Sequence, residues 1–237
     1  MEEERLERMI REREGSFSVA FPKLMNKVYV WMTLAMVITG MTAYGVANSP
    51  GILNMIFSSA GSVIFLIIAQ FGIVIALSAA INRMSLTTAT LMFILYSILT
   101  GVTFSTIFVV YTMSSIASVF FITAGMFAAM SLIGHFTKSN LSGMGSFLFM
   151  ALVGLIIATV VNFFLKSSGL ALILNYAGVI IFAGLTAFDT QRIKQMLLMC
   201  DEMDEGAHKL ALIGSLTLYL DFINMFIYLL RLFGNRE

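Results

Sequence analysis

The chain has 237 residues, of which 59% are hydrophobic and 11% are charged. A soluble globular domain contains roughly 45–50% apolar and about 25% charged residues, so this chain has too little charge to cover a water-facing surface. The net charge of +1 without a basic patch argues against a nucleic-acid-binding protein, and the single cysteine argues against a disulfide scaffold. The composition therefore predicts an integral membrane protein whose partner is the lipid bilayer.

The N-terminal segment differs from the rest of the chain because it is dense in Glu and Arg. It does not resemble a cleavable signal, since the apolar run that follows is long enough to span a bilayer. We expect residues 1–23 to form a cytoplasmic tail and residues 24–237 to form one transmembrane domain.

Seven mostly apolar stretches are each about the 20 residues that a helix needs to cross a bilayer. They are 28–47, 61–81, 87–111, 114–135, 146–166, 170–190 and 210–231. Residues 52–60 are more weakly apolar and fit either an interfacial turn or an extension of the second span. The predicted fold class is an all-α, seven-helix transmembrane bundle.

The orientation follows from the distribution of Lys and Arg, which concentrate on the cytoplasmic side of membrane proteins. Three basic residues fall on the side opposite the N-terminus: Lys166, Arg231 and Arg236. Eleven fall on the N-terminal side: Arg5, Arg8, Arg11, Arg13, Lys23, Lys27, Arg83, Lys138, Arg192, Lys194 and Lys209. The sequence predicts a cytoplasmic N-terminus.

Acidic residues are absent from the whole stretch between Glu14 and Asp189. Two acids, Asp189 and Asp221, nevertheless lie within apolar segments. An ionisable residue at membrane depth costs about 2.5–3.5 kcal/mol even on permissive scales, so such a residue is a candidate functional group.

Each of these aspartates lies on a polar stripe with helical spacing. In the seventh span the stripe is Thr217, Asp221, Asn224, Tyr228 and Arg231. In the sixth span it is Asn175, Gly178, Phe182, Thr186 and Asp189. A polar face cannot point at lipid, so we expect the seventh span to lie inside the bundle.

Two interpretations of the aspartates are open. If they meet, two poorly solvated carboxylates cannot both ionise cheaply, and they would share one proton as a pH sensor and weak cation ligand. Alternatively, each is satisfied separately, Asp189 near Arg192 and Asp221 by Thr217 or Asn224. Asp189 lies about 27 Å from the outer end of its predicted span and Asp221 about 16 Å from the inner end of its own. A contact therefore requires that the seventh helix begin below the membrane or that the sixth tilt.

Several motifs resemble those of the Bax inhibitor-1 family of transmembrane Bax inhibitor motif proteins. The two most specific are Gly184-Leu185-Thr186-Ala187-Phe188-Asp189-Thr190-Gln191-Arg192-Ile193 and Leu218-Tyr219-Leu220-Asp221-Phe222-Ile223-Asn224-Met225-Phe226. Softer matches are Leu229-Leu230-Arg231-Leu232-Phe233-Gly234, Ala79-Ala80-Ile81-Asn82-Arg83-Met84-Ser85 and Val161-Asn162-Phe163-Phe164. The resemblance as a whole extends over nearly everything after Lys23, and it is to a bacterial member of the family.

The resemblance implies a seven-helix bundle with helix 7 central, in which Asp189 and Asp221 form a paired-aspartate pH sensor. It also implies a pH-dependent calcium leak, with Arg231 in the polar network of the gate and Asn224, Thr186 and Thr217 around it. Some members carry Glu in helix 2, where this chain has Gln70, so a second acidic site on the path is in doubt. Gln70 and Arg83 remain candidates for lining the path.

These observations predict a cation leak channel of the inner membrane, for calcium or other cations, with transient calcium binding at Asp189 and Asp221. We expect neither enzyme activity nor a cofactor. An intramembrane aspartyl protease would need a Gly-x-Gly-Asp motif and a Pro-Ala-Leu element, whereas the prolines here are Pro22 and Pro50. The alternative is a non-conducting protein that modulates another membrane complex, such as a protease.

Overall fold

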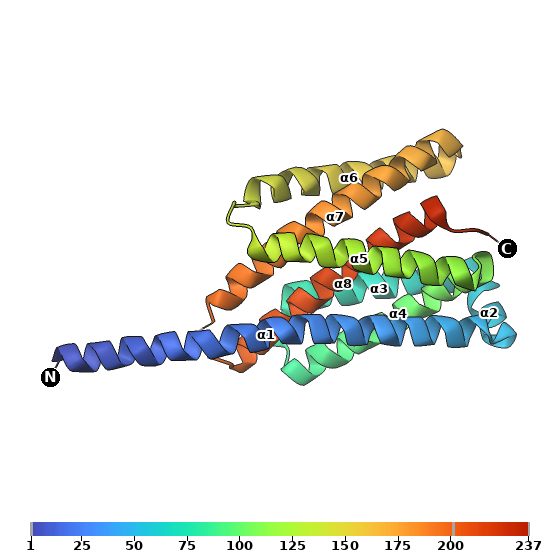
Figure 1. The fold of residues 1–237 in the computed structure, drawn as a ribbon. Coiled ribbons are helices and arrows are strands. Elements are labelled where there is room, and N and C mark those ends of the chain that lie inside the picture. Colours follow the sequence, from blue (N-terminus) through green and yellow to red (C-terminus); the bar gives the residue numbers. More distant parts are fainter. Residues whose placement is uncertain (1, 201, 237) are drawn as a thin grey trace. The chain divides into compact units, whose positions relative to one another are not determined.

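The computed structural model describes residues 2–200 and 202–236, with the side chains of residues 21–200 and 202–236. Within these ranges the chain is α-helical, with one isolated β-bridge between Tyr111 and Arg236 (Figure 1). The helices are α1 (Glu2–Ala47), α2 (Pro50–Phe57), α3 (Ala60–Ala80), a 3₁₀ turn η1 (Ile81–Arg83), α4 (Leu86–Val110), α5 (Met113–Phe136), α6 (Ser142–Leu165), α7 (Ser168–Leu198) and α8 (Glu205–Phe233). The prediction of an all-α fold is confirmed.

Seven of these helices are long and apolar enough to cross a membrane, as predicted. The chain is therefore a multi-pass membrane protein. The apolar part of α1 begins at Phe21, seven residues before the predicted span. Among the later helices, the largest differences from the predicted spans are at α7, which continues eight residues past 190 to Leu198, and at α8, which begins five residues before 210. Both extensions are polar enough to escape a search for apolar runs, although they continue the helical backbone. Residues 50–57 form a separate short helix, with Pro50 at its first position, where proline is well accommodated.

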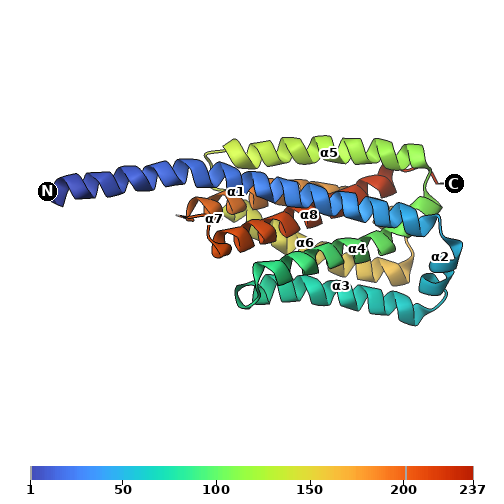
Figure 2. The ribbon, with the colours of Figure 1, turned by 90° about the horizontal axis from the view of Figure 1, so that it is seen from below.

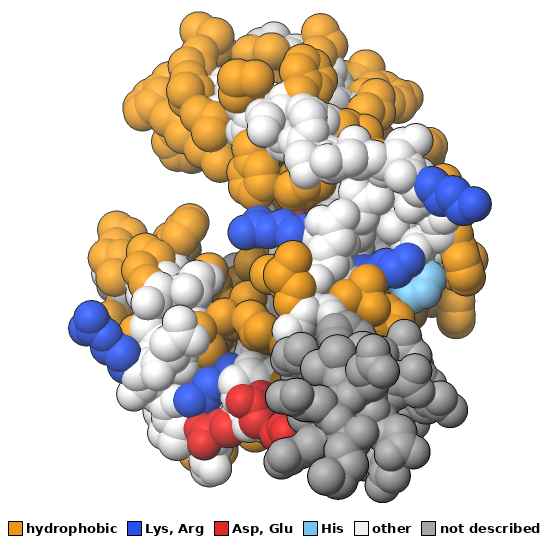
Figure 3. Space-filling view, turned by 90° about the vertical axis from the view of Figure 1, so that its left-hand side faces the viewer, with side chains coloured by type: hydrophobic (Ala, Val, Ile, Leu, Met, Phe, Trp, Pro, Cys, Tyr) orange, Lys and Arg blue, Asp and Glu red, His pale blue; other side chains and the backbone are white. Residues whose placement is uncertain are grey.

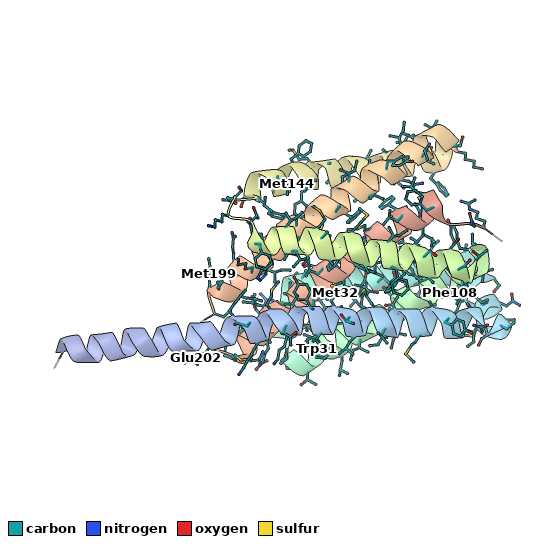
Figure 4. The ribbon with its side chains drawn as sticks, in the orientation of Figure 1. Trp31, Met32, Phe108, Met144, Met199 and Glu202 are labelled. Carbon is teal, nitrogen blue, oxygen red and sulfur yellow. The ribbon has the colours of Figure 1, made fainter. Side chains whose placement is uncertain are left out.

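Helix α1 runs from Glu2 to Ala47 without a break at residue 23 (Figure 1 and Figure 2). Its apolar span begins at Phe21, close to the expected start of the transmembrane domain. The side chains of residues 2–20 lie outside the described part of the chain, and so does any contact of the predicted tail. Farther along α1, Met32 is buried and Trp31 is half-buried (Figure 4).

Most transmembrane helices begin at a side chain that caps their first turn. A Ser, Thr or Asp oxygen accepts a hydrogen bond from a backbone N–H that has no partner within the helix. Such caps are Ser59 at α3, Ser85 at α4, Thr112 at α5, Ser167 at α7 and Asp204 at α8. In hydrocarbon an unsatisfied N–H is expensive, so these short polar residues fix where each helix starts.

Large apolar side chains are exposed along the flanks of the helices, among them Met41 and Phe121, which are each 72% exposed. In a soluble protein such a surface would aggregate, whereas in a bilayer it is the surface that meets lipid. In Figure 3, Lys, Arg, Asp and Glu side chains are visible on the face turned to the viewer, and apolar side chains gather beside them. This distribution agrees with helices that cross a membrane.

The chain divides into two compact units, one formed by Met1–Thr103 with Ile193–Leu216 and the other by Phe104–Arg192 with Thr217–Glu237. In the first unit the Gln70 amide on α3 donates to Leu99 O on α4 at 3.1 Å and to the Thr103 hydroxyl at 2.6 Å. The Thr39 hydroxyl on α1 donates to Ser97 O on α4 at 3.0 Å. These bonds join apolar helices that have no hydrophobic force between them in lipid.

The first unit also contains the start of α8. The Glu205 carboxylate accepts a hydrogen bond from Leu86 N at 3.0 Å, which places a negative charge at the N-terminus of α4. The same carboxylate forms an ion pair with Lys209 at 3.0 Å. These contacts attach the first turn of α8 to α4 and account for the helix starting before its apolar segment.

In the second unit α7 packs against α5, α6 and the second half of α8. A Cβ on Gly134 of α5 would collide with the backbone carbonyl of Ala187 on α7, so the two helices approach as closely as two backbones can. On the other side of α7, Phe188 fills the space that a side chain at Gly145 of α6 would need. The two glycines are therefore what allows α7 to lie this close to both neighbours.

The share of buried residues differs widely among the spans. In the most apolar window of α8 it is 67%, against 11% for α3 and 11% for α6. This burial agrees with the expectation that the polar stripe of the last helix does not point at lipid.

Candidate functional site: an aspartate pair between the last two spans

The two polar stripes predicted from the sequence face each other in the second unit. Near the C-terminal end of α8, the Tyr228 ring stacks on Phe182 of α7 with centroids 5.9 Å apart, and it fills the space beside Gly178. Two turns away on each helix, Asp189 of α7 meets Asp221 of α8. Seven residues separate Phe182 from Asp189 and Asp221 from Tyr228, so both contacts belong to one antiparallel register.

Asp189 and Asp221 are 4% and 5% exposed, and their side chains hydrogen-bond to each other. A hydrogen bond between two carboxyl groups needs a proton on one of them, because ionised carboxylates only accept. Asp221 Oδ2 is buried and has no hydrogen-bond partner among the described residues. The pair is therefore a contact between two buried carboxyl groups in which one oxygen of Asp221 has no partner among the described residues.

The predicted spans placed Asp189 and Asp221 at different distances from the inner membrane surface, and the observed helices extend beyond those spans. Asp189 lies nine residues from the end of α7, and Asp221 lies sixteen residues after the start of α8. Asp189, which was one residue from the end of its predicted span, is thus interior to α7, and Asp221 is interior to α8 as it was to its predicted span. The sequence could not show this because the additional turns are not apolar.

The side chains that could satisfy the aspartates separately take different roles. The Arg192 guanidinium is close enough to Asp189 to interact with it electrostatically, while Asp189 also bonds to Asp221. The Asn224 amide donates to Leu220 O at 2.8 Å on its own helix. The Thr186 hydroxyl, fully buried, donates to Phe182 O at 2.8 Å. Thr217 is half-buried one turn before Asp221.

Gln191, two residues after Asp189, was not singled out in the sequence analysis. Its side-chain amide accepts a hydrogen bond from Leu141 N and donates one to Ser139 O, each at 2.8 Å. One residue earlier, the Thr190 hydroxyl hydrogen-bonds to Ser131 of α5 at 3.2 Å. The turn of α7 that carries Asp189 is thereby fixed to α5 and to the α5–α6 loop. The available signal was the polar triplet Thr190-Gln191-Arg192 directly after the aspartate.

Arg231, expected in the gate network, is not brought to the pair. Ten residues of α8 separate it from Asp221, which is about 15 Å along a helix. Its guanidinium lies over the Tyr228 ring, 5.8 Å from the centroid. It lines a cavity at the C-terminal end of α8, and its setting is therefore distinct from that of the aspartates.

The two candidate path residues belong to the first unit. Gln70 is half-buried and its amide nitrogen binds α4, as described above. Arg83 is exposed in the η1 turn between α3 and α4. Neither lies in the unit that holds the aspartates.

A resident metal would need more ligands than the pair supplies. Calcium takes six to eight oxygen ligands. Within the described ranges no cluster of three or more His, Cys, Asp or Glu residues forms.

The fold and the site together define a class of protein: an all-α, multi-pass membrane protein with a buried carboxyl pair between its last two spans. The family model described as "Inhibitor of apoptosis-promoting Bax1" matches residues 22–237. The chain belongs to this Bax inhibitor family, as the motifs around Asp189 and Asp221 predicted.

Bacterial relatives match nearly the whole chain. The protein named inner membrane protein YbhL of Escherichia coli is 52% identical over 214 residues, which are 90% of this chain and 92% of the relative. An uncharacterized protein of Borreliella burgdorferi is 47% identical, covering 91% and 93% of the two chains. An uncharacterized protein of Rickettsia prowazekii is 42% identical, covering 95% and 94%.

Proposed function

We propose that this protein is a pH-sensitive cation leak channel, with calcium as its main ion, in which Asp189 and Asp221 are the sensor and gate. Its role is transport rather than catalysis. The observation that carries the proposal is the contact between two buried carboxyl groups. They lie in a chain whose acids otherwise fall in the N-terminal segment, the α7–α8 connection and the last residue.

The mechanism follows from the charge states of the pair. With one proton, a carboxyl group donates to the neighbouring carboxylate and holds α7 against α8. Without that proton, two negative charges are in contact at low dielectric and repel each other. With a second proton the pair becomes neutral. Each change alters how α7 packs on α8, so proton binding is coupled to a shift between two helix arrangements.

The chemistry of the pair suits a cation. Asp221 Oδ2 has no partner among the described residues, and the adjacent carboxyl group of Asp189 adds further oxygens. Hard cations such as calcium prefer oxygen ligands, and a site with few of them binds weakly enough to release the ion. The carboxyl pair would therefore attract a cation but bind it weakly enough to release it.

The neighbouring polar groups would support the gate. Gln191 holds the α5–α6 loop to the turn of α7 that carries Asp189, so a movement of that turn reaches the loop. Three further polar residues lie on the same stripes as the aspartates and add polar groups between α7 and α8: Thr186, Thr217 and Asn224. In this proposal Gln70 and Arg83 line the path elsewhere in the chain.

The proposed membrane rests on the relatives, and the proposed orientation rests on the distribution of Lys and Arg. A relative of more than half identity is named an inner membrane protein, which supports the same membrane for this chain. The excess of Lys and Arg on the N-terminal side supports a cytoplasmic N-terminus.

Flux into liposomes tests the proposal. The purified chain is reconstituted in vesicles that contain a calcium-sensitive dye, and calcium entry is followed across a series of pH values. We expect entry above that of empty vesicles and a dependence on pH that is lost in Asp189→Asn and in Asp221→Asn, because neither variant can exchange the shared proton.

Asp204→Asn is the matched control. It removes the same charge from an exposed position and keeps an oxygen to cap α8, so its flux should equal that of the unmodified protein. No calcium entry above empty vesicles at any pH would overturn the channel and favour a non-conducting modulator of another membrane complex, such as a protease.

A further inference from the structure

The C-terminal end of α8 borders a second polar site that the aspartate pair does not use. A cavity of about 210 Å³ lies entirely within the second unit. Its lining comes from the end of α4, the α6–α7 hairpin, the last turns of α8 and the segment after it. The residues are Tyr111, Thr159, Asn162, Ala171, Leu174, Asn175, Tyr228, Arg231 and Arg236.

The charged residues that line this cavity are both positive. Arg231 and Arg236 are both exposed, and no acid is among the described residues that line the cavity. Apart from ring contacts with Tyr228 and Tyr111, neither guanidinium has a hydrogen bond or an ion pair to the described residues. Two guanidinium groups carry ten N–H donors and accept nothing. The described lining therefore offers these two cations no carboxylate.

The backbone holds these donors in place. Thr112 N donates to Asn235 O at 3.1 Å, and Asn235 N donates to the Ser115 hydroxyl at 3.0 Å. Together with the bridge between Tyr111 and Arg236, these bonds fix the segment after α8 to the start of α5. On the opposite wall, Tyr228 hydrogen-bonds to the Thr159 side chain and ties α8 to α6. Arg236 is thus carried by a fixed segment, not by a loose terminus.

The volume of the cavity and its guanidinium donors indicate which kind of ligand it fits. A water molecule takes about 30 Å³ of liquid volume, so the cavity is several times larger than a site for water or a halide ion. Guanidinium groups bind oxyanions through paired N–H donors, and phosphate groups match that geometry. Asn162 and Asn175 add neutral amide groups to the walls.

We propose that this cavity binds a phosphate group, with Arg231 and Arg236 as its charged donors and Asn175 as a neutral one. The phosphate belongs either to an anionic phospholipid or to a soluble phosphate. Exposed apolar side chains on the same hairpin, Phe163, Phe164 and Ile173, are suited to contact the acyl chains of a lipid. The inference is independent of the proposed leak, because it uses the C-terminal end of α8 and not the interior turn that carries Asp221.

Calorimetric titration of the full-length protein in an uncharged detergent tests the site. The two probes are a short-chain phosphatidylglycerol and inorganic phosphate. We expect saturable binding of at least one probe, weakened about tenfold in Arg231→Gln and in Arg236→Gln, because each variant loses charge-assisted hydrogen bonds to the phosphate. Binding of the lipid alone assigns the lipid as the source, and binding of phosphate with the same variant pattern assigns a soluble anion.

Two further variants keep the test sharp. Lys166→Gln removes an exposed cation from the α6–α7 hairpin that does not line the cavity, so it should bind like the unmodified protein. Asn175→Leu removes a neutral donor from α7 without changing any charge, and it should weaken binding several-fold. The proposal is overturned if the unmodified protein binds neither probe, or if the arginine variants bind as tightly as the unmodified protein.

Discussion

Asp189 and Asp221 are costly residues at membrane depth, and their contact explains how the fold accommodates them. An acid at the centre of a membrane helix costs about 2.5–3.5 kcal/mol. Placing two of them together lets one proton remove one charge and supply a hydrogen bond at the same time. The oxygen Asp221 Oδ2 is left without a partner in the described part of the chain, and a buried acceptor of this kind is a feature of functional sites.

The contribution of Gln191 to stability can be tested with Gln195, a residue of the same type on the same helix, as the control. Gln191→Ala removes two hydrogen bonds to the α5–α6 loop, whereas Gln195→Ala changes an exposed side chain one turn later. We expect Gln191→Ala to lower the free energy of unfolding by about 1–3 kcal/mol, because Leu141 N and Ser139 O lose their partners. Hydrogen exchange should be faster at the Leu141 amide in Gln191→Ala and unchanged in Gln195→Ala. If the Leu141 amide exchanged at the same rate in both variants, the proposed role of Gln191 in holding the α5–α6 loop would be wrong.

Sequence reasoning found the aspartates because acids are absent from the rest of the spans. It could not establish their contact, since that depends on the register of two helices whose ends are not apolar. It missed Gln191 for a different reason: a side chain that binds the backbone of a loop leaves no periodic pattern. Arg231 lies on the same stripe as Asp221, but ten residues of helix place the two groups about 15 Å apart along the axis, so sharing a stripe does not bring Arg231 to the pair.

At the scale of elements, α7 organises the second unit through close approaches to its neighbours. The sequence contains 18 glycines, and nothing in their spacing separates those at contacts from those that face open space. Gly134 touches the backbone of α7, whereas a Cβ on Gly125 of the same helix would have nothing within 4 Å. Only the packing of the helices distinguishes these two positions.

This difference predicts opposite effects of the same substitution. Gly134→Ala should destabilise the protein by about 1–3 kcal/mol, because the added methyl group pushes α5 away from α7. Gly125→Ala should be neutral or stabilising by up to about 1 kcal/mol, since alanine is the better helix former. Thermal unfolding in detergent measures both. A Gly134→Ala variant as stable as Gly125→Ala would show that the two helices do not pack as described.

At the scale of the whole molecule, the number of spans could be predicted because a bilayer demands about 20 apolar residues per helix. The ends of the helices could not, because Ser, Thr and Asp caps and polar final turns carry no hydropathy signal. The distribution of Lys and Arg predicts an orientation, with the α5–α6 loop on the cytoplasmic side and the α6–α7 connection on the other side.

Cysteine labelling tests this orientation. In a Cys200→Ser background, Lys138→Cys lies on the α5–α6 loop and Ser167→Cys on the α6–α7 connection, both at exposed positions. A membrane-impermeant thiol reagent added to intact cells should label Ser167→Cys and leave Lys138→Cys unlabelled. Both should react after the membrane is permeabilised. Labelling of Lys138→Cys alone in intact cells would reverse the topology.

The central claim is that Asp189 and Asp221 hold one proton between them, and infrared spectroscopy of the protein in lipid observes that proton directly. A protonated carboxyl group absorbs apart from a carboxylate and shifts in heavy water. We expect a protonated-carboxyl band at neutral pH that disappears in Asp189→Asn and also in Asp221→Asn, while Asp204→Asn retains it. A band that survives either substitution at the pair, or no such band in the unmodified protein, would contradict the account.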